Sequence, residues 1–371
     1  MNVKTVGRSS LQPKSPTRYR LQDMSLFRWL FAPLAPFYCL VVKARNRAFD
    51  SDPRRAERLS SPVISIGNLS VGGTGKTPLT LHLAQRLQEK GFSNVILSRG
   101  YGGRREVDPM DVNPESDPCE VGDEPAMIAQ RLGKNRVIVG RRRAFAALRA
   151  LSHEPIPKLL ILDDGFQHRA LYRDLDILLL DGVRKWGNGK LLPLGNLREP
   201  MTSARRANAL VVTRGSRTQK SEIEDWWSKY GSSGPIFYLD FIIGSLRNAA
   251  TGQRLVLPAT LGPLFAFCAI GHPEAFYADL LVAGLPWSDT KSFRDHQRLS
   301  PGQITRMAST AHDSGATGLV CTEKDAVKLS ASHLKASDMP IWIAEQEVTG
   351  AESLLKWIVD SLSNLNRATI F

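Results

Sequence analysis

The chain has 371 residues, 42% of them hydrophobic and 23% charged, so it can bury a large core as one large domain or two ordinary ones. The formal charge of +13 favours an anionic partner such as nucleic acid, an acidic membrane or a phosphorylated ligand. The four cysteines form neither a CxxC pair nor a zinc-ligand cluster, which fits a reducing cytoplasm and implies no structural metal. The composition is typical of a globular protein.

Residues 1–23 carry five basic side chains, several serines and a single acid. This pattern predicts a disordered basic tail, and the alternative is a targeting segment. Met24 is a plausible alternative start, which favours the tail.

Residues 26–42 are almost wholly apolar, but they include Arg28 and two prolines. A spanning helix needs about 20 apolar residues, so we predict instead a membrane-associated helix over residues 24–48 that lies in the interface. The alternative is a helix packed on the protein's own core. Membrane contact is favoured by aromatic residues at the start of the segment and basic residues just after it: Phe27, Trp29, Lys43, Arg45 and Arg47.

Short apolar runs then alternate with helical patterns, which predicts an α/β fold with parallel sheets and crossover helices. We expect a P-loop kinase domain over residues 49–242, a β linker over 243–257 and a smaller α/β domain over 258–371. The expected strands lie at 63–66, 94–97, 137–139, 159–162, 177–180, 210–213, 237–242, 265–270, 318–321 and 341–344. Helices are expected to start near residues 76, 124, 141 and 221, and to span 274–283, 303–312 and 352–365.

The strongest motif is SVGGTGKT at residues 70–77, between an apolar strand and an amphipathic helix. This context predicts a P-loop, in which backbone N–H groups face phosphate oxygens at the start of a helix. Lys76 would bridge the β- and γ-phosphates of ATP, and Thr77 would hold Mg²⁺. Ser70 replaces the usual first glycine, and Val71 stands where deviant Walker loops carry a lysine. The predicted nucleotide-binding residues are Ser70, Val71, Gly72, Gly73, Thr74, Gly75, Lys76 and Thr77.

Two carboxylates, Asp163 and Asp164, end the buried strand LLILD, where a Walker B aspartate is expected. They can coordinate Mg²⁺ directly or through water, and the alternative is that they cap a turn before Gly165. Gln167 and His168 extend the same polar edge, although either could instead satisfy nearby backbone groups.

A second acid pair, Asp123 and Glu124, opens a predicted helix. Acids are favoured there as caps, but phosphoryl transfer to an alcohol also needs an aspartate to accept the hydroxyl proton. His272 and His296 lie at predicted loop edges in the second half and could face the first domain across a cleft, but loop histidines are usually surface residues. Sequence physics alone selects neither.

Arginines near residues 99, 141–143 and 198 are suited to bidentate phosphate binding, although solvated helix faces explain many basic triplets. The triplet follows a predicted strand end, which favours a ligand role for Arg141. The basic residues are dispersed and are not interleaved with aromatic side chains, so nucleic acid is the least favoured partner.

Together these segments resemble the tetraacyldisaccharide 4'-kinase family. The shared pieces run in order from residue 24 to about 365: IGNLSVGGTGKTP, LSRGYGG, GDEP, VGRRR, LDDGFQH, LREP, a GHP loop, RDH and TEKDAVK. The resemblance implies ATP-dependent phosphorylation of the 4'-hydroxyl of an acylated glucosamine disaccharide 1-phosphate, giving lipid IVA. It also implies a peripheral enzyme on an anionic surface, the cytoplasmic face of the inner membrane.

The resemblance assigns roles to positions of this chain. Asp123 matches the catalytic base, His296 the histidine that assists it, and Lys76 keeps its P-loop role. Glu124, Asp163 and Asp164 match acidic residues around Mg²⁺. Further positions match active-site residues whose roles are less defined: Tyr101, Gln167, His168, Arg198 and Glu199.

The family fold implied is two α/β domains joined by a short β connection, with ATP between them. Two other functions remain open: a P-loop kinase for a soluble small molecule, against which the apolar residues 26–42 argue, and a membrane-recruited P-loop ATPase switch. Hydrolysis without a phosphorylated lipid would favour the switch.

Overall fold

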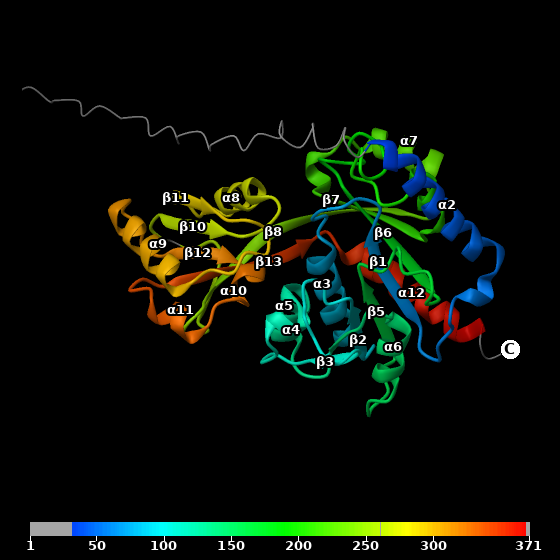
Figure 1. The fold of residues 1–371 in the computed structure, drawn as a ribbon, viewed down its shortest axis with the longest axis horizontal. Helices are drawn as coiled ribbons and strands as arrows, with labels where there is room; N and C mark the ends of the chain where they lie inside the picture. Colours follow the sequence, from blue (N-terminus) through cyan, green and yellow to red (C-terminus); the bar gives the residue numbers. More distant parts are fainter. Residues whose placement is uncertain (1–31, 260, 369–371) are drawn as a thin grey trace, which may run out of the picture.

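The computed structural model describes residues 32–259 and 261–368 of the chain. The predicted basic tail and the first part of the predicted membrane helix lie outside these residues. The described chain forms two lobes, shown in Figure 1, which share a 13-stranded sheet. Twelve of its strands follow the order β11-β10-β12-β13-β8-β7-β6-β1-β5-β2-β4-β3, while β9 pairs with β8 off this path. The α/β class expected from the sequence is confirmed.

The large lobe is built on parallel strands with the P-loop strand at their centre. β1 lies between β5 and β6, and its Ile66 is in register with Asp163 of β5. The carboxyl ends of neighbouring parallel strands therefore meet at one edge of the sheet. The strands of this lobe are β1 (Val63–Asn68), β2 (Asn94–Ser98), β3 (Met110–Val112), β4 (Val137–Val139), β5 (Leu159–Asp163), β6 (Leu175–Asp181) and β7 (Ala209–Thr213).

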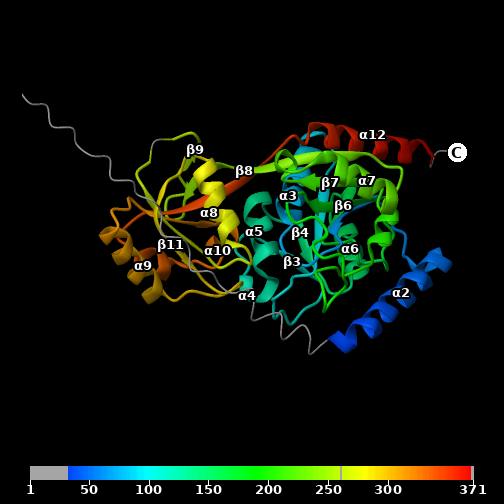
Figure 2. The same ribbon diagram turned by 90° about the horizontal axis from the view of Figure 1, so that it is seen from above.

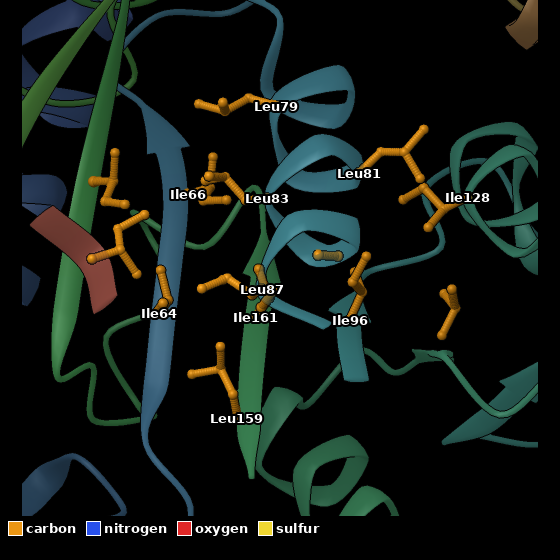
Figure 3. Packing of buried hydrophobic residues seen from close by; sticks show 14 of the residues in the cluster. Ile64, Ile66, Leu79, Leu81, Leu83, Leu87, Ile96, Ile128, Leu159 and Ile161 are labelled. Atoms are coloured by element: carbon orange, nitrogen blue, oxygen red, sulfur yellow. The ribbon is translucent and has the colours of Figure 1, made fainter. Parts of the chain in front are cut away.

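The helices of the large lobe cover the sheet with their apolar sides. Leu79, Leu83 and Leu87 recur along α3 and face Ile64 of β1 and the strands beside it, as Figure 3 shows. All three leucines are fully buried or nearly so. The helices of the large lobe are α3 (Lys76–Glu89), α4 (Pro118–Val121), α5 (Asp123–Leu132), α6 (Arg143–Leu151) and α7 (Lys220–Tyr230), with short 3-10 turns η2 (Pro53–Arg55), η3 (Met201–Arg206) and η4 (Gly215–Arg217).

The small lobe has its own parallel strands and two buried clusters of apolar side chains. Its strands are β9 (Arg254–Val256), β10 (Leu264–Cys268), β11 (Trp287–Ser292), β12 (Leu319–Thr322) and β13 (Ile341–Thr349). Its helices are α8 (Pro273–Val282), α9 (Pro301–Asp313), α10 (Glu323–Ala326) and α11 (Ala331–Lys335).

The two lobes are joined by strand β8 (Ile236–Asn248), which is longer than the predicted strand at 237–242. Its first part pairs in parallel with β7 of the large lobe, and its second part pairs antiparallel with β13 of the small lobe. The expected boundary at residues 242 and 243 thus falls inside one continuous strand. The predicted linker 243–257 forms the end of β8 and its hairpin partner β9.

The last helix, α12 (Glu352–Ala368), packs on the large lobe, although the sequence analysis assigned residues 258–371 to the smaller domain. Leu354, Ile358 and Leu362 lie in the same buried cluster as α3 and β1. A helix that returns to the first lobe adds a second link between the lobes, because β13 leads directly into it.

At the other end of the described chain, η1 (Ala32–Leu34) leads into α2 (Ala35–Ser51), which lies on the large lobe away from α12 (Figure 2). Several apolar side chains are exposed here, including Leu34, Phe37, Leu40 and Val41. In the part of the chain that the structure describes, no helix is long and apolar enough to cross a membrane.

The packing of α12 predicts that it stabilises the large lobe. Ile358 is fully buried, so Ile358→Ala should lower the free energy of unfolding by about 2–4 kcal/mol through lost burial and an unfilled cavity. Denaturant unfolding measures this loss, with Lys356→Ala on the exposed side of the helix as the control. Equal midpoints for the two variants would mean that α12 is only loosely attached.

Candidate active site

The phosphate-binding loop follows β1 and enters α3 at Lys76. Gly72 and Gly75 adopt left-handed backbone conformations, with φ of 101° and 82°. Asn68, at the end of β1, donates from its amide to the Thr74 hydroxyl at 3.0 Å and accepts from the Lys76 ammonium group at 3.3 Å. The end of β1 therefore holds both the loop and its lysine.

Two of the predicted nucleotide-binding residues have protein partners along the first turn of this loop. The backbone N–H of Val71 donates to the carbonyl of Asn196 at 2.8 Å, and Ser70 forms an isolated bridge with Leu197. Because the Val71 amide is already paired, we expect the phosphate-facing amides to begin at Gly72.

Asp163 and Asp164 lie beside the loop at the end of β5, as predicted. Asp163 is almost fully buried and accepts a hydrogen bond from the Thr80 hydroxyl at 3.1 Å. Asp164 has a left-handed backbone with φ of 53°, which is costly for a non-glycine residue and common at functional sites. Its carboxylate lies 3.6 Å from the Lys76 nitrogen and 2.9 Å from the Arg198 guanidinium.

The acidic residues at this edge repel one another. Burial, with the nearby Glu124 and Asp164 carboxylates, raises the pKa of Asp163 to about 7. Burial also acts to raise the pKa of Asp164, but the charges of Lys76 and Arg198 outweigh it and hold that pKa below its ordinary value. A divalent cation beside Asp163 would relieve the repulsion.

The oxygen donors here fit Mg²⁺, which prefers oxygen ligands and keeps several waters and phosphates in its shell. Within the described residues, no group of three or more His, Cys, Asp or Glu side chains is close enough to form a complete metal cage. Mg²⁺ bound with ATP needs only one or two protein carboxylates, so Asp163 with the largely buried Thr77 is a sufficient set.

A histidine of the small lobe contacts an aspartate of the large lobe. His296 Nδ1 lies 2.9 Å from Asp123 Oδ2, and Asp123 is the first residue of α5. His296 has a left-handed backbone with φ of 62°, and its backbone N–H donates to the carbonyl of Ala269, just after β10. The residue pattern alone did not choose between His272 and His296, whereas the family resemblance favoured His296. The structure places His296 beside Asp123, the predicted base.

The other histidine considered, His272, lies over the phosphate-binding loop. Arg184 contacts both the His272 ring and the carbonyl of Gly73, so it connects the GHP loop of the small lobe to the P-loop. Arg184 also pairs with the buried Asp181 at the end of β6. No sequence motif singled out this arginine.

Two lysines of the TEKDAVK segment reach the His296–Asp123 pair, although neither was predicted to have a role. Lys324 lies 3.2 Å from His296 Nε2 and 3.7 Å from Glu124. Lys328 is almost fully buried, 3.9 Å from Asp123. Burial acts to raise the pKa of Asp123, but the hydrogen bond with His296 and the charge of Lys328 outweigh it and lower that pKa.

Three further predicted residues lie around this edge. Tyr101 is exposed, and its ring centroid lies 6.1 Å from that of His296. Gln167 donates to the carbonyl of Asn68 at 2.9 Å. Burial, together with the charge of Arg143, lowers the pKa of His168 to about 4, so this ring is neutral at physiological pH.

Of the arginine triplet at residues 141–143, Arg143 lies near the carboxylates of the site, whereas Arg141 was predicted to bind the ligand. Arg141 is exposed, and its backbone N–H donates to Asp108. Arg143 is buried close enough to Asp163 and Asp164 for their charges to affect its pKa, which burial lowers to about 10. Arg143 therefore keeps its charge at neutral pH. Its guanidinium donates to the carbonyl of Gly140 at 2.8 Å, whereas the two carboxylates whose charges act on it lie further along the chain, so a motif alone could not identify it.

Glu199 is fully buried among side chains of α2 and η3. Its role as an active-site residue stays a prediction. Three cationic or amide groups surround the carboxylate: Arg45 at 3.2 Å, Asn46 at 2.8 Å and Arg206 at 2.9 Å. Glu199 therefore contacts helix α2, which precedes the strands of the large lobe.

The sequence was compared with models of known protein families. The family model of the tetraacyldisaccharide-1-P 4'-kinase matches residues 27–363. This chain belongs to that family. The resemblance predicted from the motifs is therefore confirmed.

Curated relatives named tetraacyldisaccharide 4'-kinase agree over almost the full chain. The protein from Chromobacterium violaceum is 37% identical over 90% of this chain and 93% of its own. The one from Syntrophus aciditrophicus is 37% identical over 89% of this chain and 91% of its own. A crystal structure of the Aquifex aeolicus family member LpxK in complex with ATP superimposes with a TM-score of 0.70, at 30% identity, covering 91% of this chain and 99% of that one.

The geometry of the loop predicts different outcomes for two neighbouring glycines. A Cβ at Gly75 would lie 2.2 Å from the Phe241 ring in a left-handed conformation, whereas one at Gly73 would meet no atom within 4 Å. Gly75→Ala should therefore weaken ATP binding by about tenfold or more, and Gly73→Ala by much less. Calorimetric titration with ATP measures the affinity of each variant. Equal losses of affinity in Gly75→Ala and Gly73→Ala would contradict the prediction.

Proposed function

We propose that this chain transfers the γ-phosphoryl group of ATP to the 4'-hydroxyl of tetraacyldisaccharide 1-phosphate, giving lipid IVA. The observation that carries the proposal is the Asp123–His296 pair, at 2.9 Å, on the sheet edge that also holds the P-loop. Glu124 connects the two parts, because its charge acts on Asp163 and its carboxylate lies 3.7 Å from Lys324. Family membership supports both the reaction and the lipid substrate.

The proposed roles follow from the contacts. Asp123, kept ionised by His296 and Lys328, accepts the proton of the 4'-hydroxyl. The sugar oxygen then bonds to the γ-phosphorus as the bond from that phosphorus to the β–γ bridging oxygen breaks. Lys76 stabilises the charge on the transferred group. Mg²⁺, held by Thr77, Asp163, Asp164 or Glu124, would neutralise phosphate charge.

The proposed location is the cytoplasmic face of the inner membrane, to which the protein binds peripherally. Supporting this, the exposed apolar side chains of Phe37, Leu40 and Val41 lie on one helix with the exposed basic residues Lys43 and Arg47. Such a surface suits an anionic membrane that also presents the acylated substrate.

The proposal is tested by following labelled γ-phosphate from ATP to purified tetraacyldisaccharide 1-phosphate in detergent with Mg²⁺. Asp123→Ala should lower kcat by about 100-fold or more and leave ATP affinity nearly unchanged, because Asp123 accepts the proton and does not hold phosphate. Asp123→Asn, which keeps the shape, should be equally impaired. ATP consumption without a labelled lipid would instead favour the ATPase switch.

A pH profile tests the role of Lys328. Asp123 must be ionised to accept a proton, so activity is lost as the pH falls through its pKa. Lys328→Met removes a positive charge that lowers this pKa, so the acidic limb of kcat/KM should move to higher pH by about one unit, while Lys328→Arg leaves it in place. An unmoved acidic limb in Lys328→Met would mean that the lysine only supports the fold.

A further inference from the structure

Helix α2 is attached to the large lobe through a polar side. Its two buried residues are Val42 and Asn46, one helical turn apart, while Phe37, Leu40 and Val41 are exposed. Asn46 donates to Glu199 at 2.8 Å and to the Ser203 hydroxyl at 3.3 Å. A buried carboxylate and a buried amide are costly without partners, so these hydrogen bonds favour one position of α2 on the large lobe, which we call the helix seat.

The segment that receives α2 is the one that carries Arg198. Arg45 adds an ion pair to Glu199 at 3.2 Å, and the Tyr38 hydroxyl donates to the carbonyl of Arg198 at 2.9 Å. Glu199 is further held by Arg206 at 2.9 Å. Helix α2 therefore forms hydrogen bonds with the backbone of Arg198 and with the side chain of Glu199.

On its other side, the same segment reaches the reaction centre. The Arg198 backbone N–H donates to Leu69, just before the P-loop, at 2.7 Å. Its guanidinium donates to both oxygens of Asp164, at 3.1 and 2.9 Å, and to Gln167 at 3.3 Å. One short stretch of chain thus separates α2 from the carboxylate that also faces Lys76.

A second contact runs to the loop after β5. The carbonyl of Asn46 accepts from Arg169 at 2.9 Å, and Arg169 also pairs with Asp50 near the end of α2 at 2.7 Å. Arg169 follows the Asp163-to-His168 loop directly. Asn46 therefore holds, through two different groups, both loops whose side chains meet at Asp164.

We propose that α2 is a positioning element of the kinase site, in which Tyr38 and Asn46 set the place of Arg198 against Asp164. The inference rests on the proposed function and deepens it. These residues touch neither reacting group, so they are positioning residues. Loss of the helix seat lets Arg198 leave Asp164, and Asp164 then loses one of its two cationic partners beside the P-loop.

A double-mutant cycle tests this in neutral detergent, where attachment to a membrane does not limit the rate. Asn46→Ala should lower kcat by about tenfold and Tyr38→Phe by about threefold, each with less than about a twofold change in the KM for ATP. In an Arg198→Ala background, neither substitution should lower kcat further. Ser51→Ala is the control and should match the wild type, because the Ser51 hydroxyl is exposed and donates to the carbonyl of Ala48 within α2 itself.

Two results would overturn the proposal: wild-type kcat in both α2 variants, or the same fold loss with and without Arg198. Tyr38→Phe removes a single hydroxyl, so it decides the matter even where Asn46→Ala fails to fold. A separate readout is the NMR signal of the Arg198 guanidinium, which both variants should shift and Ser51→Ala should not. That signal tests the positioning even if the wild-type chain labels no lipid, a result that would refute the proposed function alone.

Discussion

One strand, β8, is paired on the large-lobe side with β7 and on the small-lobe side with β13, and the position of every side chain that crosses between the lobes depends on it. Because both pairings belong to one continuous backbone, the two lobes share a single sheet. Helix α12 packs on the large lobe and forms a second link between them. His296 can then approach an aspartate 173 residues away at hydrogen-bond distance. The strand sets the separation over which the lobes can bring base, histidine and phosphate together.

The second constraint is the balance of charge at the sheet edge. Asp163 is buried among other carboxylates, and its pKa is raised to about 7, whereas the pKa values of Asp164 and Asp123 are lowered by cations held near them. The site thus has one carboxylate, Asp163, whose negative charge is not compensated, and two, Asp164 and Asp123, whose charges are compensated by nearby cations. This difference fits a cation at Asp163 and a proton acceptor at Asp123.

Sequence patterns were sufficient for the strands of the sheet centre, because buried parallel strands are continuous apolar runs. They missed β3 and β11, which lie at the two ends of the strand order, because edge strands are short or polar: β11 reads WSDTKS. Motif spacing located the P-loop and both acid pairs. It gave no role to Lys324 and Lys328 and did not single out Arg143, since the value of those charges lies in contacts with residues far away in the sequence.

Glu199 shows that two adjacent residues of one motif can contact different parts of the structure. An acid next to an arginine that reaches Asp164 invites a direct role, yet its side chain points the opposite way, into a fully buried seat for α2. Arg198 and Glu199 are adjacent, yet Arg198 contacts Asp164 and Glu199 contacts α2, so this segment serves two surfaces at once. Helix α2 has exposed apolar side chains and is held on its buried side by hydrogen bonds to this segment, so one short stretch of chain separates the helix from the phosphate-binding edge.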